Sequence, residues 1–98
     1  KKAYLGQDFH FEAEVVAEHL IQKIEIKIHD EQLDAGQTNP AWEYENVIIY
    51  TDNLKNVHLH EHIDVPSNVA TGEYHIHISV TDKEGNQTEK EDHIDVVK

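Results

Sequence analysis

The stretch VHLHEHIDV, residues 57–65, alternates apolar and polar side chains along its length. Successive side chains of a β-strand point to opposite faces, so this period of two predicts a half-buried strand. His58, His60 and His62 would then stand in a row on the outer face. The side chains on the core face would be Val57, Leu59, Ile63 and Val65.

The same alternation recurs through most of the chain, and no long segment follows a helical period. Asp, Gly, Asn and Pro gather between the alternating segments and predict loops at 33–40 and 66–72, with a hairpin tip at 82–86. Residues 18–22 would form at most one helical turn. The predicted strands are 9–15 (FHFEAEV), 24–29 (IEIKIH), 45–50 (ENVIIY), 57–65, 73–80 (EYHIHISV) and 93–97 (HIDVV).

Six or seven short strands separated by turns predict an all-β protein, an immunoglobulin-like antiparallel β-sandwich. A jelly roll or a small barrel is the alternative. The 98 residues suffice for one domain with a modest core, so we expect a single domain over residues 1–98. The chain has no cysteine, so the Cys–Trp–Cys pattern of antibody domains is absent.

Four of these segments carry a resemblance. FHFEAEV (9–15), IEIKIH (24–29), HEHIDVP (60–66) and GEYHIHISVTDKEGN (72–86) together resemble an uncharacterised family of lipoprotein domains from Bacteroidetes-type bacteria, and the last third is similar to the closing strands of bacterial immunoglobulin-like domains. The resemblance implies export to the bacterial cell envelope, in the periplasm or on the outer-membrane surface. It also implies a lipid anchor on a cysteine outside this sequence, and it assigns no activity.

Composition excludes several classes of partner. A formal charge of −12, with eight lysines and no arginine, argues against nucleic acid, because phosphate backbones are bound by clustered Lys and Arg. No apolar run approaches the ~20 residues needed to span a bilayer. Without cysteine or methionine, any bound metal would take imidazole and carboxylate ligands, which suits Zn(II), Cu(II) or Ni(II).

Nine histidines are the outlying feature of the composition. In an immunoglobulin-like arrangement, the strand at 9–16 lies beside the strand at 57–65, and strands 24–29, 73–81 and 92–97 form the other sheet. The outer face of the first sheet would carry His10, Glu12, Glu14, His58, His60, His62 and Asp64. The outer face of the second would carry His29, His75, His77, His93 and Asp95, which leaves only His19 outside both groups.

This spacing permits metal binding. Cross-strand neighbours have Cβ atoms about 4.5–5.5 Å apart, so a His-x-His pair and a third ligand from the next strand can reach one ion. We predict a metal site at His58, His60 and His62, with His10 or Glu12 contributing, and a further pair at His75 and His77. The plain alternative is that these histidines are solvated residues of exposed sheet faces.

Glu61 breaks the alternation, because its parity turns a carboxylate inward between Leu59 and Ile63. A buried unpaired carboxylate is costly. Either Glu61 lies at a sheet end or a β-bulge open to water, or the HEH segment forms a corner in which Glu61 joins or orients the histidines.

We expect no enzymatic activity, because neither Ser67 nor Ser79 lies in a nucleophile motif and no carboxylate pair has acid–base spacing. The predicted function is non-catalytic capture or handling of Zn(II) or Cu(II) by an exported module. The alternative is an interaction or spacer module of a surface lipoprotein that binds an unidentified protein or a glycan. A pH-sensing role is also open, since protonating all nine histidines would raise the formal charge from −12 to −3.

Overall fold

The computed structural model describes all 98 residues and contains seven β-strands and no helix. Since there is no helix, none is long and apolar enough to cross a membrane. The strands are β1 (Lys2–Tyr4), β2 (Asp8–Val16), β3 (Ile21–Leu33), β4 (Tyr44–Ile49), β5 (Asn56–Asp64), β6 (Gly72–Asp82) and β7 (Gln87–Val97).

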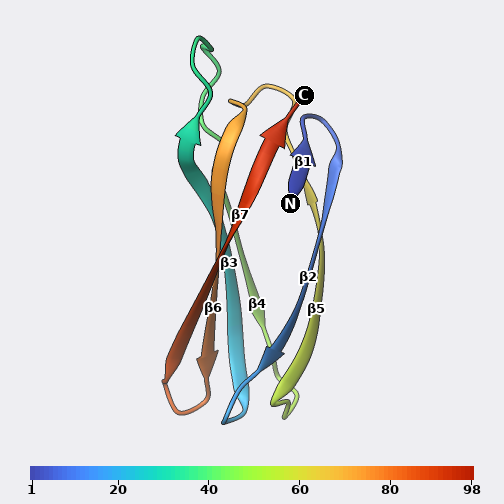
Figure 1. Cartoon of the computed structure of the whole chain (residues 1–98). Coiled ribbons are helices and arrows are strands. Elements are labelled where there is room, and N and C mark those ends of the chain that lie inside the picture. The colour runs from blue at the N-terminus through green and yellow to red at the C-terminus, as the bar shows by residue number, and fades with distance from the viewer.

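The strands form two sheets that face each other along the length of an elongated molecule (Figure 1). One sheet has five strands in the order β1-β7-β6-β3-β4, and the other contains only β2 and β5. The principal extents are 47 × 21 × 17 Å. The all-β sandwich predicted from the alternation is therefore confirmed, and so is the division of the main strands between the two sheets.

Two details of the prediction are wrong. The short strand β1 was not predicted, because three residues are too few to show a period of two. It pairs with β7 in parallel, so the sandwich is not wholly antiparallel. Residues 18–22 form no helical turn, since β3 already begins at Ile21 and pairs there with Asp82 of β6.

The core lies between the sheets and is built from the predicted inward side chains. Phe11 and Ile63 come from the two-stranded sheet and are almost fully buried. Ile24, Ile26, Ile28, Tyr74, Ile76, Ile94 and Val96 cover them from the five-stranded sheet. Each Leu or Ile side chain buried in this way contributes about 1.5–3 kcal/mol relative to exposure, and together they hold the sheets face to face.

Trp42 and Tyr74 tie the β3–β4 connection to the core. Both side chains are buried, with ring centroids 6.0 Å apart. Tyr74 Oη donates a hydrogen bond to the carbonyl oxygen of Ala70 (2.7 Å) and accepts one from the backbone N–H of Trp42 (3.0 Å). The connection is thus anchored in the core by its tryptophan. Residues 34–40 form the loop predicted at 33–40, while Leu33 is the last residue of β3.

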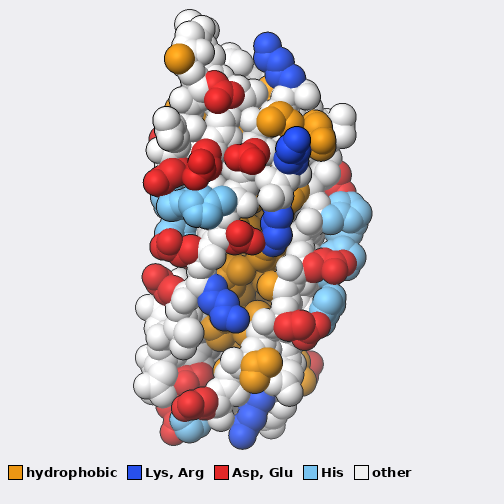
Figure 2. Space-filling view, in the orientation of Figure 1, with side chains coloured by type: hydrophobic (Ala, Val, Ile, Leu, Met, Phe, Trp, Pro, Cys, Tyr) orange, Lys and Arg blue, Asp and Glu red, His pale blue; other side chains and the backbone are white.

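Because the inner faces are used by the core, the alternating polar side chains are left on the two outer faces. Figure 2 shows histidine on both sides of the molecule, with acidic side chains beside it and an apolar strip between the sheets. The fold therefore presents two separate histidine surfaces.

Candidate functional site

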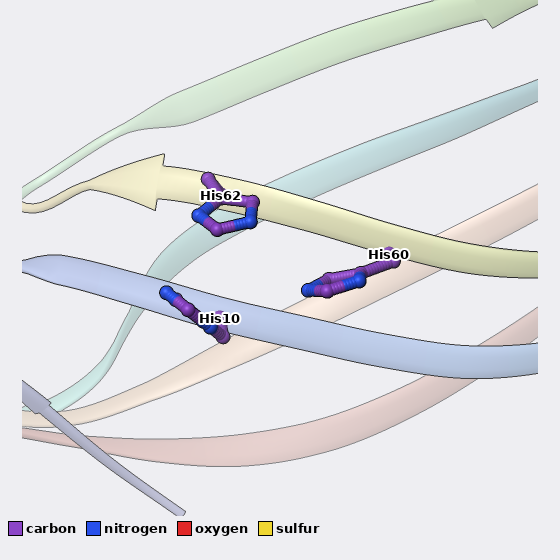
Figure 3. Close-up of side chains that lie close together, drawn as sticks. All are labelled: His10, His60 and His62. Carbon is purple, nitrogen blue, oxygen red and sulfur yellow. The ribbon is translucent and has the colours of Figure 1, made fainter.

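The first histidine cluster is assembled by the pairing of β2 with β5. His10 lies directly opposite His62 in the register, and His60 lies two residues along β5, opposite Glu12. All three rings stand on the same outer face, His10 over β2 and the other two over β5 (Figure 3). The period-two alternation of both strands turns the rings outward, and the cross-strand register brings them together.

The three rings are close enough to share one ion. One nitrogen from each of His10, His60 and His62 lies within 4.8 Å of the other two. The ring centroids of His10 and His62 are 4.1 Å apart, and those of His60 and His62 are 5.0 Å apart with nearly parallel planes. We therefore define the first cluster as His10, His60 and His62.

Asp8 orients two of these rings through a single carboxylate oxygen. Asp8 Oδ2 is 2.8 Å from His10 Nε2 and 2.9 Å from His62 Nδ1. The hydrogen bond from His62 is the main cause that lowers the pKa of Asp8, and His10 acts in the same direction. Each imidazole has two nitrogens, so a ring bonded to Asp8 still has one nitrogen for a metal. Asp8 shares the parity of His10, and this signal could have identified it from the sequence.

His58 does not belong to this cluster. Its Nδ1 is hydrogen-bonded to the carboxylate of Glu14, the residue opposite it on β2, and this contact raises the pKa of His58. His58 and His62 are four residues apart on one strand, which places them about 13 Å apart. The structure thus brings two of the three predicted histidines, His60 and His62, together with His10, and places His58 apart from them beside Glu14.

The two predicted glutamates also lie outside the convergent group. Glu12 stands on the histidine face, with Oε1 3.6 Å from His60 Nε2, as a neighbour of one ring only. Glu61 lies opposite Phe11 and is half-buried on the inner side of the strand. Pairing of β2 with β5 runs without a shift, so there is no bulge or corner that could turn Glu61 toward the histidines.

Glu61 instead faces the tyrosines of the opposite sheet. Burial is the main cause that raises the pKa of Tyr44 and of Tyr50, and the negative charge of Glu61 adds to the rise in both. The partial exposure of Glu61 keeps its carboxylate in contact with water and makes its inward position tolerable.

The second cluster lies on the outer face of the five-stranded sheet. One nitrogen from each of His29, His75 and His77 lies within 4.8 Å of the other two, so the predicted pair is joined by a histidine from β3. His75 is also close to His93 and Glu73 on its other side. The register places His29, His75 and His93 in one row across β3, β6 and β7.

His19 pairs with the β6–β7 turn. Its Nδ1 is 2.7 Å from Glu84 Oε2, and Asp82 is near both. Asp82 Oδ1 accepts hydrogen bonds from the backbone N–H groups of Glu84 and Asn86, which closes the hairpin tip. The oxygens of Asp82 therefore serve the predicted turn.

Both histidine clusters offer nitrogen ligands at an open surface. Three imidazoles leave at least one position of a four-coordinate Zn(II) for water or a carboxylate. The largest cavity, about 580 Å³, lies elsewhere: Ala13, Val15, Ile78 and Val80 are among its lining residues, and neither cluster opens into it. A smaller, more open hollow of about 340 Å³ is bordered by His29 of the second cluster, together with Lys27 and Tyr44. The three imidazoles of each cluster are suited to holding an ion.

Comparison with known proteins gives a family and no named relative. A family model described as "Domain of unknown function (DUF4625)" matches residues 1–97. No curated protein matches the chain, and no solved structure does.

Proposed function

Since the chain belongs to DUF4625, a family of unknown function, we propose a function from the site itself: the domain binds a divalent transition metal, Zn(II) or Cu(II), through His10, His60 and His62. The observation that carries this proposal is the convergence of three imidazoles from two strands, each offering a nitrogen within 4.8 Å of the others. Zn(II) and Cu(II) are among the divalent ions that imidazole ligands suit.

The surroundings of the cluster support a cation. Asp8 contacts two of the rings, and Glu12 lies beside the third. Carboxylates that bond to one nitrogen of an imidazole fix its tautomer and make the other nitrogen a better ligand. The formal charge of −12 gives the whole molecule a negative potential, which attracts cations.

The role we propose is capture or handling of the metal without catalysis. The side chains of His10, His60 and His62 are 58%, 43% and 57% exposed, so an ion there would remain in contact with water. Catalytic metal sites need a shaped, dry cavity as well as an open coordination position. The resemblance to exported lipoprotein domains supports the bacterial cell envelope as the place where this role is performed.

Calorimetric titration with Zn(II) and Cu(II) at pH 7.5 tests the proposal. We expect the His10→Ala, His60→Ala, His62→Ala triple variant to lose one equivalent of metal relative to the wild type. His58→Ala is the matched control, because His58 stands on the same face but pairs with Glu14. It should bind as the wild type does.

Two results would overturn the proposal. One is wild-type binding no tighter than ~100 μM, which corresponds to roughly −5.5 kcal/mol. The other is a triple variant that takes up the same number of equivalents with the same affinity as the wild type. Far-ultraviolet circular dichroism of each variant shows that the fold is intact.

A second candidate function is binding of a protein along the β4 edge. β4 is the last strand of its sheet, and the outward side chains of Val47 and Ile49 are 43% and 63% exposed. An unpaired edge strand can accept a strand from another chain. Thermal melting that responds neither to Zn(II) nor to a chelator would favour this interaction role over metal binding.

A further inference from the structure

We propose that the domain has a second zinc site, independent of the first, formed by His29, His75 and His77 on the outer face of the five-stranded sheet. His29 lies directly opposite His75 in the β3–β6 register, and His77 follows two residues along β6. The ring centroids of His29 and His77 are 4.6 Å apart, and His75 lies 5.8 Å from each.

Acceptor oxygens beside the two opposed rings indicate which nitrogen of each ring is free. His77 Nδ1 lies 3.1 Å from Glu91 Oε1, and His29 Nδ1 lies 3.1 Å from the carbonyl oxygen of Asp30. Because a carbonyl or carboxylate oxygen only accepts hydrogen bonds, we infer that both Nδ1 atoms carry the proton. Both Nε2 atoms are then the ligand atoms, in the arrangement that metal-bound histidines adopt with their outer hydrogen-bond partners.

The two free nitrogens point at each other. His29 Nε2 and His77 Nε2 are 2.6 Å apart. If both rings are neutral and both Nδ1 atoms are donors, two lone pairs face each other across this distance, which is unfavourable unless a cation lies between them. A shared proton would satisfy the pair, and so would a metal ion bonded to both atoms.

A zinc ion fits after a small opening of the pair. Two tetrahedral ligands at 2.0–2.1 Å from zinc lie about 3.3 Å apart, so the two nitrogens need to separate by about 0.7 Å. The third ring, His75, has Nδ1 3.4 Å from Glu31 Oε2 on β3, and this carboxylate leaves its Nε2 for the ion. Zinc then has three imidazole ligands and one open position.

Two of the three rings of this second site are better sheltered than the rings of the first, whereas His29 is exposed. The side chains of His75 and His77 are 17% and 23% exposed, whereas those of the first cluster are all above 40%. Rings already held by neighbours lose less rotamer freedom when they bind. The two sites lie on the outer faces of different sheets with the core between them, so they share no ligand.

His93 provides a test of the ligand set. Its Nδ1 lies 2.8 Å from Glu73 Oε1, and its ring centroid lies 4.4 Å from that of His75. His93 therefore lies on the same outer face as the second site. It is on the β7 side of His75, away from the opposed nitrogens of His29 and His77. We assign the ion to the His29–His77 side, because only there do two free nitrogens face each other.

Zn(II) titration in the background of His10→Ala, His60→Ala, His62→Ala tests the second site by itself. We expect this variant to bind one equivalent of Zn(II). Adding His77→Ala should weaken that binding at least tenfold, and adding the more exposed His29→Ala should do the same. Adding His93→Ala, the matched control, should leave the affinity within about twofold.

Imidazole ¹⁵N spectra of the same background variant give a readout that is independent of affinity. Zn(II) should shift the Nε2 signals of His29 and His77 while their Nδ1 atoms stay protonated. Circular dichroism and the melting temperature of each variant separate loss of ligands from loss of the fold.

Three outcomes would overturn the second site. The first is that the background variant binds no Zn(II), and the second is that His93→Ala and His77→Ala lower its Zn(II) affinity equally. The third is that the ¹⁵N shifts respond to pH and not to Zn(II), which would mean that a proton alone lies between the two Nε2 atoms. Failure of the first site looks different. In that case the wild type and the background variant bind the same single equivalent, and His77→Ala abolishes it in both.

Discussion

Asp8 contacts two imidazoles of the first cluster through one carboxylate oxygen, which lies 2.8 Å from His10 Nε2 and 2.9 Å from His62 Nδ1. At the scale of single residues, such neighbours decide which histidines can act as ligands. His58 lies on the same strand and the same outer face as His60 and His62, yet its Nδ1 is hydrogen-bonded to the carboxylate of Glu14. The chemistry of each ring therefore depends on the residue opposite it.

Asp8→Asn should weaken metal binding at the first cluster by roughly 10-fold, because removal of an outer carboxylate typically costs 10–100-fold in affinity. Asp64→Asn is the matched control, since Asp64 lies opposite Asp8 and is also exposed, and it removes the same charge. Competition titration against a zinc-binding dye measures both. Equal losses in the two variants would show that only the net charge matters.

The contact between His58 and Glu14 should make stability depend on pH. The hydrogen bond from Glu14, with its charge and that of Glu12, raises the pKa of His58 in the folded protein above its ordinary 6.5. The folded state thus binds this proton more tightly than the unfolded state. The stabilisation is fully present below pH 6.5 and is lost as the pH rises through the folded pKa.

Urea denaturation of the wild type and of His58→Ala between pH 5 and pH 8.5 measures this effect. The wild type should exceed the variant in free energy of unfolding at the acidic end, and the difference should shrink as the pH rises. A difference that grows with pH would contradict the assignment.

At the scale of elements, strand pairing decides which side chains meet. β2 and β5 pair without interruption from Asp8 and Asp64 to Val16 and Asn56. On the other sheet, β6 begins at Gly72, which pairs with Leu33 at the end of β3. Gly72 has φ of +139°, and a Cβ atom there would lie 2.6 Å from the carbonyl oxygen of Gln32. The close approach of the strands thus depends on a missing side chain.

Gly72→Ala should lower the free energy of unfolding by about 1–3 kcal/mol, through the strained backbone and the clash with β3. Gly36→Ala is the control, because Gly36 also has a positive φ (+79°) but no atom within 4 Å of an added Cβ. Chemical denaturation should show a smaller loss for Gly36→Ala. If the two losses are equal, the contact with Gln32 contributes nothing.

At the scale of the whole molecule, the core divides the polar surface into two. Most inward positions of the main strands carry apolar side chains that join the two-stranded sheet to the five-stranded one, and the histidines lie on the opposite outer faces. Figure 2 shows these faces on the two sides of the molecule. An ion bound on either face stabilises the folded chain, because the unfolded chain cannot hold three rings together.

Zn(II) should therefore raise the melting temperature. At a free concentration of 100 times the dissociation constant, one site adds about 2.7 kcal/mol to the free energy of unfolding. Differential scanning calorimetry should show the rise and its reversal by a chelator. Zinc should not change the melting temperature of a variant in which five histidines are replaced by alanine: His10, His29, His60, His62 and His77. A zinc-dependent shift in that variant would refute both sites.

Much of the fold could be predicted from local pattern. The period-two alternation in 9–15, 24–29, 57–65 and 73–80 identified the strands and the faces, because the pleat of a strand turns alternate side chains to opposite sides whatever the neighbour. The same rule placed Glu61 inward. β1 could not be found in this way, since its three residues gain their structure from pairing with β7.

The amino-acid sequence by itself determined the sandwich, its inward residues and the two outer histidine faces, since these follow from side-chain alternation along each strand. Which histidines converge was decided only by the tertiary structure. The register of β2 on β5 brings His10 to His62 and leaves His58 with Glu14. The register of β3 on β6 places His29 opposite His75, and its ring then reaches His77 two residues further along β6. Register depends on hydrogen bonds between segments far apart in the chain, and one residue of slip would turn each ring to the other face.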